Sequence, residues 1–155
     1  MTWAHIHLVT VHLPLVGMAL CFVLLVLSVM RRSAELRQVA LIGIFLSGIA
    51  VYPIGFAGEQ AEEFVEELSG IDHHQLEEHE EAGELAVKIA IGMGLLSGLT
   101  ALCFCFGLKV SHSLLYLTMA GVISALFFMG LAASEGARMR HAPEIDTGPG
   151  LFLPA

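Results

Sequence analysis

Charged residues are scarce in this chain, and their scarcity excludes most soluble proteins. Only 14% of the 155 residues are charged, whereas 56% are hydrophobic and the mean hydropathy is +0.78. An average soluble domain carries about 25% charged residues, because it must cover a large surface with polar side chains. The composition therefore excludes a soluble enzyme and a disordered tail, and it predicts an integral membrane protein with one domain.

Motifs for thiol redox chemistry, covalent haem and nucleic acid are also missing. The three cysteines, Cys21, Cys103 and Cys105, lie inside apolar segments and form neither a CxxC nor a CxxCH motif. With a net charge of −8, the chain has no basic stripe that would bind a phosphate backbone, so we expect no nucleic-acid partner. No nucleophile–base pair or phosphate loop stands out, and hydrolytic catalysis is therefore not indicated.

Four segments are apolar over the length of about 20 residues that a helix needs to cross a bilayer. They are residues 8–30, 39–58, 85–108 and 114–133. Two short connections and one longer one favour an all-α, up-down-up-down four-helix bundle. We expect this transmembrane domain to occupy residues 1–142, and the proline- and glycine-rich residues 143–155 to form an irregular tail.

The long connection, residues 59–84, holds eleven of the fifteen acids. Residues 59–68 (EQAEEFVEEL) place apolar side chains at helical spacing and predict that the second helix continues through them. Ser69 and Gly70 break this pattern, and Asp72 is a suitable N-cap for a helix that leads into the third span. Helices two and three are therefore predicted to extend beyond the bilayer as a helical hairpin.

The basic residues predict an orientation. Arg31, Arg32, Arg37 and Lys109 place four positive charges on one side of the bundle, against the single acid Glu35. The other side carries the remaining three of the seven bases. The positive-inside rule then places both termini in the periplasm, with the protein in a bacterial cytoplasmic (inner) membrane.

The histidines are the main functional signal in the sequence. There are eight: His5, His7, His12, His73, His74, His79, His112 and His141. In an up-down bundle all of them except His112 lie at the same end. Ionisable groups near a membrane usually face the bundle interior or a cavity, so this end is the predicted site.

Helix rise gives the approximate height of each histidine above the opposite end. At about 1.5 Å per residue, His12 lies roughly 27 Å up, His7 about 35 Å, His141 about 40 Å and His79 about 44 Å. His12 and His79 are on diagonal helices and form the first candidate ligand pair, although their heights differ by about 17 Å. His7 with His79, or His141 in place of either, fits the heights better.

Three uses are compatible with such a cluster. The first is bis-histidine ligation of haem b within the bundle, with Glu59 and Glu80 as supporting or proton-handling groups. The second is a zinc or iron site without haem, built from imidazoles and a carboxylate. Its candidate ligands are His7, His12, His79, His141 and Glu59. The third is an anchor subunit that holds no cofactor.

Three sequence motifs resemble a known family. His7-x4-His12-Leu13-Pro14 is similar to the opening HPxxVHFP-type motif of a bacterial family of small four-helix membrane proteins that carries a domain-of-unknown-function label. The segment 58–82 resembles the hairpin pattern of that family and ends in its HEEA motif. The segment 136–144 resembles its GGxIRHxE ending. The chain departs from the family in lacking a proline after His7 and in having Ala137 in place of a glycine.

Members of that family also occur joined to c-type cytochrome or Rieske-type domains, so the resemblance implies membrane electron transfer. It implies site residues at His7, His12, His79 and His141. The leading hypothesis is therefore a haem b cytochrome, or a haem-bearing subunit of an oxidoreductase complex. Such a protein would link membrane quinol to a periplasmic cytochrome or other redox subunit, either within a complex or as an oligomer.

Overall fold

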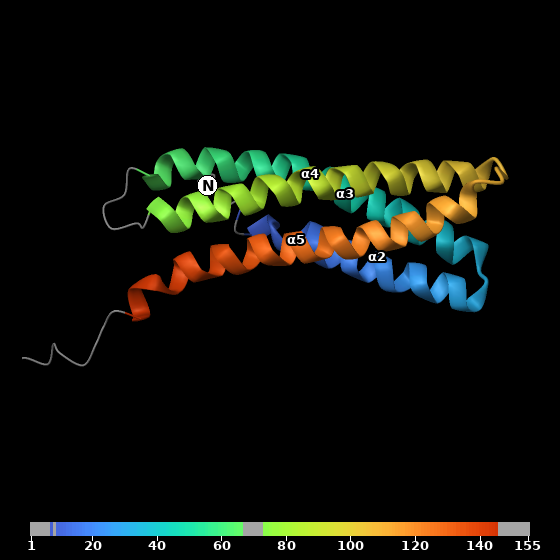
Figure 1. Ribbon diagram of the computed structural model, residues 1–155, viewed down its shortest axis with the longest axis horizontal. Coiled ribbons are helices and arrows are strands. Elements are labelled where there is room, and N and C mark those ends of the chain that lie inside the picture. Colours follow the sequence, from blue (N-terminus) through green and yellow to red (C-terminus); the bar gives the residue numbers. More distant parts are fainter. Residues whose placement is uncertain (1–6, 8, 67–72, 146–155) are drawn as a thin grey trace, which may run out of the picture.

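The chain is all-helical. A computed structural model describes residues 7, 9–66 and 73–145 (Figure 1). It contains the helices α2 (His12–Arg31), α3 (Ala34–Glu66), α4 (His73–Cys105) and α5 (Ser111–Ile145). All four are long and apolar enough to cross a membrane. The predicted helical class and the predicted number of membrane-spanning helices are thereby confirmed.

Three of the helices extend well past the apolar segments. Helix α3 continues to Glu66 and α4 begins at His73, so the acidic residues that flank 67–72 are helical, as predicted. The predicted break at Ser69 and Gly70 and the predicted cap at Asp72 lie outside the described residues. Helix α5 continues to Ile145, three residues into the segment that we expected to be irregular, and the rest of that segment is not described.

Helix α2 begins later than the expected apolar span, at His12 instead of residue 8. The chain before it forms a separate helical turn, in which the Val11 N–H donates to the His7 carbonyl at 2.8 Å. Pro14 lies in the first turn of α2, where a missing N–H costs no helical hydrogen bond. His7 and His12 therefore belong to different structural elements, which the continuous apolar pattern does not indicate.

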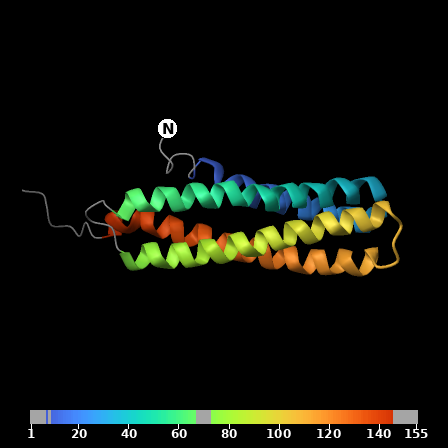
Figure 2. The same ribbon diagram turned by 90° about the horizontal axis from the view of Figure 1, so that it is seen from above.

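The helices pack in chain order around the bundle. Helix α2 packs on α3, α3 on α4 and α4 on α5, while α2 and α5 make the smallest of the interfaces (Figures 1 and 2). The α2–α3 and α4–α5 connections lie together at one end of the bundle, which we call the loop end (residues 31–37 and 104–112). The opposite end is called the histidine end (residues 7–12, 54–66, 73–82 and 132–145).

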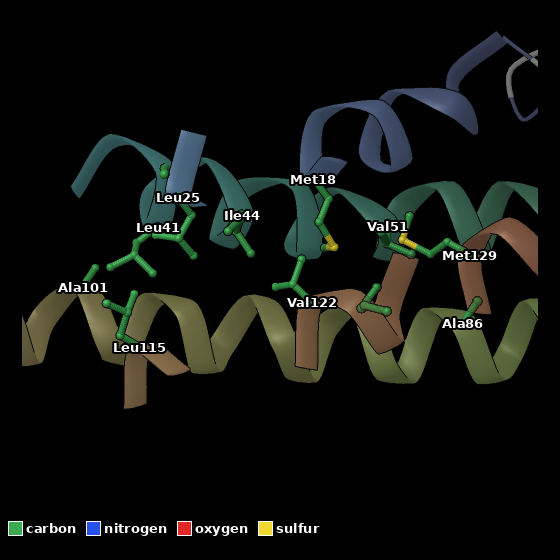
Figure 3. Packing of buried hydrophobic residues seen from close by; sticks show 13 residues of the cluster. Met18, Leu25, Leu41, Ile44, Val51, Ala86, Ala101, Leu115, Val122 and Met129 are labelled. Carbon is green, nitrogen blue, oxygen red and sulfur yellow. The ribbon is translucent and has the colours of Figure 1, made fainter. Parts of the chain in front are cut away.

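Aliphatic and methionine side chains fill the centre of the bundle. Met18 and Leu25 of α2 and Leu41 and Ile44 of α3 are fully buried, and Val122 of α5 lies opposite them (Figure 3). Large apolar side chains also cover the outside. Among those exposed are Leu13, Val16, Leu20, Leu46, Leu99, Phe106 and Phe127. An apolar exterior over an apolar core is what a lipid environment requires.

Helices α3 and α4 are in backbone contact at Gly48 of α3 and Gly94 of α4. A Cβ atom at Gly48 would lie 2.6 Å from the Ala90 carbonyl oxygen and 2.7 Å from the Cα of Gly94. Polar bonds reinforce this packing further along α4. The Ser97 hydroxyl donates to the Leu41 carbonyl at 2.8 Å, and the hydroxyl oxygens of Thr100 and Thr118 are 2.9 Å apart. Small residues and interhelical hydroxyl bonds are the usual means of joining helices in lipid.

We predict that Gly48→Ala destabilises the bundle by about 1–3 kcal/mol, because the added methyl group would press on main-chain atoms that cannot rotate away. The free energy of unfolding in detergent micelles, measured by titration with a denaturing detergent, is the test. Gly92→Ala on α4 is the control, since no atom lies within 4 Å of the Cβ position there. Equal stability of the two variants would contradict the prediction.

Candidate functional site

His7 is held against α3 at the histidine end. Its Nδ1 lies 3.0 Å from the carbonyl oxygen of Ile54, and the side chain is half-buried. Gly58, four residues after Ile54, gives the ring its space. A Cβ atom at Gly58 would be 2.9 Å from Cε1 and 3.0 Å from Nδ1 of His7. We call such an arrangement, a carbonyl acceptor with a glycine one helical turn later, a histidine seat. The seat of His7 consists of the Ile54 carbonyl and Gly58.

His79 has the same kind of seat on a different pair of helices. It extends from α4, and its Nδ1 lies 3.1 Å from the carbonyl oxygen of Ala132 on α5. Gly136 is four residues after Ala132, and a Cβ atom there would be 3.0 Å from Cε1 of His79. The two histidines therefore share one local arrangement, although they are 72 positions apart in the chain.

The carbonyl partners determine which imidazole nitrogen carries the proton. A main-chain carbonyl can only accept a hydrogen bond, so Nδ1 must be the donor in both His7 and His79. In a neutral imidazole this leaves Nε2 unprotonated, with its lone pair available. An Nδ1–H bond to a carbonyl is also the usual orienting contact of a histidine that binds metal through Nε2. Both rings are thus prepared to act as ligands or proton acceptors.

His79 is within electrostatic range of His7 and of one carboxylate. The charges of His7 and of Glu135 both act on His79. Glu135 is half-buried on α5, directly before Gly136. His7 contacts α3 from the turn before α2, whereas His79 extends from α4 and contacts α5, so the two imidazoles come from different elements. At this end of the bundle, two imidazoles and an acid from separate parts of the chain therefore influence one another electrostatically.

The other predicted site residues are not brought into this group. His12 is exposed on α2, and Glu59 on α3 and Glu80 on α4 are exposed as well. His141 is part of α5, but its side chain lies outside what the structure describes. In the described part of the chain, no three His, Cys, Asp or Glu side chains form a group that could hold a metal ion. Of the predicted ligands whose side chains the structure describes, His7 and His79 are thus the two that are held by main-chain carbonyls and lie within electrostatic range of each other.

Several contributors to the site were not among the predicted site residues. These are the carbonyls of Ile54 and Ala132, the glycines at 58 and 136, and Glu135. A signal for them does exist in the sequence. Each glycine lies near the outer end of an apolar segment, and Glu135 is an acid just past the last span. That signal does not say which glycine accommodates which ring, because the helix rotation is unknown from sequence.

Comparison of the chain with family models, with curated proteins and with solved structures found no match. The family resemblance of the histidine motifs therefore stays an expectation, and the function has to be argued from the site itself.

We predict that His79 is an Nδ1–H tautomer and that Gly136→Ala disturbs it. The added methyl group would displace the ring and lengthen its bond to the Ala132 carbonyl. Imidazole ¹⁵N shifts in the detergent-solubilised protein at neutral pH report the tautomer directly. Gly130→Ala, on the same helix and with no atom within 4 Å of its Cβ position, should leave those shifts unchanged. An Nε2–H tautomer of His79 in the unmodified protein would contradict the assignment.

Proposed function

We propose that this chain is a small membrane electron-transfer protein in which His7 and His79 hold one haem b. The observation that carries the proposal is the matched seating of the two histidines, each with Nδ1 bonded to a carbonyl, which in the neutral ring leaves Nε2 unprotonated. The proposal agrees with the expectation drawn from the family resemblance.

The donor set fits this cofactor. Haem iron in bis-histidine proteins is held by two imidazole nitrogens, and His7 and His79, which come from different elements, would offer their Nε2 atoms as these two donors. Bound haem would supply one-electron redox chemistry. The Ile54 and Ala132 carbonyls hold the two ring planes, and by hydrogen-bonding Nδ1–H they make each Nε2 a stronger donor.

The small residues beside the rings also support the proposal. Gly58 and Gly136 present no side chain to Cε1 of the imidazole that each accommodates. An alanine at either position would move a ring, and a bis-histidine site tolerates little displacement because both nitrogens must reach one iron. We therefore assign these two glycines a positioning role in the site.

We further propose an arrangement in the membrane. The four helices cross it up and down, with both termini on the periplasmic side of a bacterial inner membrane. The acidic parts of α3 and α4 then extend beyond the lipid as a hairpin. The histidine end would lie near the periplasmic surface, where electrons from membrane quinol could pass to a periplasmic cytochrome or another redox subunit.

The first test is the dithionite-reduced minus air-oxidised spectrum of the detergent-purified protein, together with its haem and metal content. We expect sharp b-type bands, with haem occupancy reduced at least about tenfold by His7→Ala or by His79→Ala, since each would remove one of the two proposed iron ligands. Gly136→Ala should weaken haem binding by about 10- to 100-fold, as is usual when the support of a ligand is lost.

Two histidine variants serve as controls for this test. His74→Ala removes a largely exposed histidine whose Nδ1 lies 3.7 Å from Glu78, and it should keep full haem content. His12→Ala distinguishes the two candidate ligand pairs, and from its exposed position we expect no loss of haem. Absence of b-type bands even after addition of haemin would refute the proposal. Stoichiometric zinc or iron in such a sample would favour a metal site, and no metal would favour an anchor subunit.

A further inference from the structure

The loop end of the bundle is positively charged and carries a cluster that the redox proposal does not use. Arg31 and Arg32 end α2, Arg37 lies in the first turns of α3, and Lys109 lies between α4 and α5. Against these four bases stands one acid, Glu35.

Arg37 is the organised member of this group. Its guanidinium carbon lies 3.7 Å from the centre of the Phe104 ring, which is the distance of a stacked cation–π pair. Phe104 in turn meets the ring of His112 edge to face, with centroids 5.3 Å apart and an interplanar angle of 76°. Residues of α3, α4 and α5 thus hold the guanidinium in a defined orientation, unlike the exposed Arg31 and Arg32.

Arg37 nevertheless has no anionic partner among the residues that the structure describes. The ion pairs found there are His74 with Glu78 and Lys88 with Glu84, both on α4 near the other end. The Nε of Arg37 is buried and has no hydrogen-bond partner. A buried donor without an acceptor is costly, and native proteins usually satisfy such groups. A guanidinium that lies over an aromatic ring keeps its N–H groups in its own plane. Those N–H groups form the fork that matches two oxygens of a phosphate or carboxylate.

We infer that Arg37, supported by Phe104 and His112, binds the phosphate of an anionic phospholipid at the loop end. Lipid is the favoured source of that phosphate because large apolar side chains surround the cluster. Met30, Val39, Phe106 and Val110 are all exposed close to it in the chain and offer contacts for acyl chains. Clusters of basic residues next to membrane helices are typical binding sites for anionic headgroups. This inference is independent of whether the protein binds haem.

Native mass spectrometry of the detergent-solubilised protein with added phosphatidylglycerol or phosphatidylcholine tests the inference. We expect phosphatidylglycerol to bind the unmodified chain more tightly than phosphatidylcholine does. Arg37→Gln should weaken the binding of phosphatidylglycerol roughly tenfold, as expected for loss of a charge-assisted hydrogen bond. Arg31→Gln is the matched control, because it removes the same charge at the same end from an exposed side chain. We expect it to weaken binding about threefold or less.

A second variant covers the case in which Arg37→Gln does not fold. Arg37→Lys keeps the charge but loses the planar fork, and it should still reduce the preference for phosphatidylglycerol by a few-fold. Equal lipid preference of Arg37→Lys and the unmodified protein would overturn the inference, as would equal losses in Arg37→Gln and Arg31→Gln. Displacement of the lipid by inorganic phosphate at equal concentration would assign the site to free phosphate and would likewise overturn a lipid site.

Discussion

The approach of α3 to α4 at Gly48 and Gly94 is the constraint on which the rest of the bundle depends. In lipid, apolar side chains gain little by leaving their surroundings, so helices associate through close packing and interhelical hydrogen bonds. A Cβ at Gly48 would collide with main-chain atoms of α4, which means that the two backbones are in direct contact. This contact sets the register of α4 against α3. Toward the loop end, this register places Ser97 beside the Leu41 carbonyl. Toward the histidine end, it sets the height of His79 along the bundle.

The histidine seats use glycine for a related purpose. In a helix the carbonyl of residue i points toward residue i+4, so the side chain at i+4 normally covers one side of that carbonyl. With glycine at 58 and 136, the second lone pair of the Ile54 and Ala132 carbonyls is open to an imidazole from a neighbouring helix. Both helices continue through the seats, although Pro53 in α3 has no N–H to offer the Ile49 carbonyl. A polar side chain is thus fixed at the histidine end without breaking the helix that holds it.

The sequence allowed the helices to be predicted better than the site. Long apolar segments identify the four helices that could span a membrane, and the spacing within 59–68 correctly indicates that α3 continues beyond its apolar segment, as far as Glu66. Counting residues gives height but not rotation about the helix axis, and His12 shows the consequence. It is exposed on the same face as Leu13, Val16 and Leu20. Because α2 is apolar all round, no polar face in its sequence indicates which side is turned outward.

The two ends of the bundle differ in charge. This difference favours one orientation in the membrane, in which the two proposed sites lie on opposite sides. His79 and Phe104 are 25 residues apart on α4, a distance of about 37 Å along a straight helix, so neither site contacts the other. The basic loop end suits the anionic surface of the cytoplasmic leaflet. The acidic helix ends around His79 then face away from that surface. A headgroup held by Arg37 would anchor the bundle on one side, and the paired histidines would open on the other, where a redox partner outside the membrane could reach them.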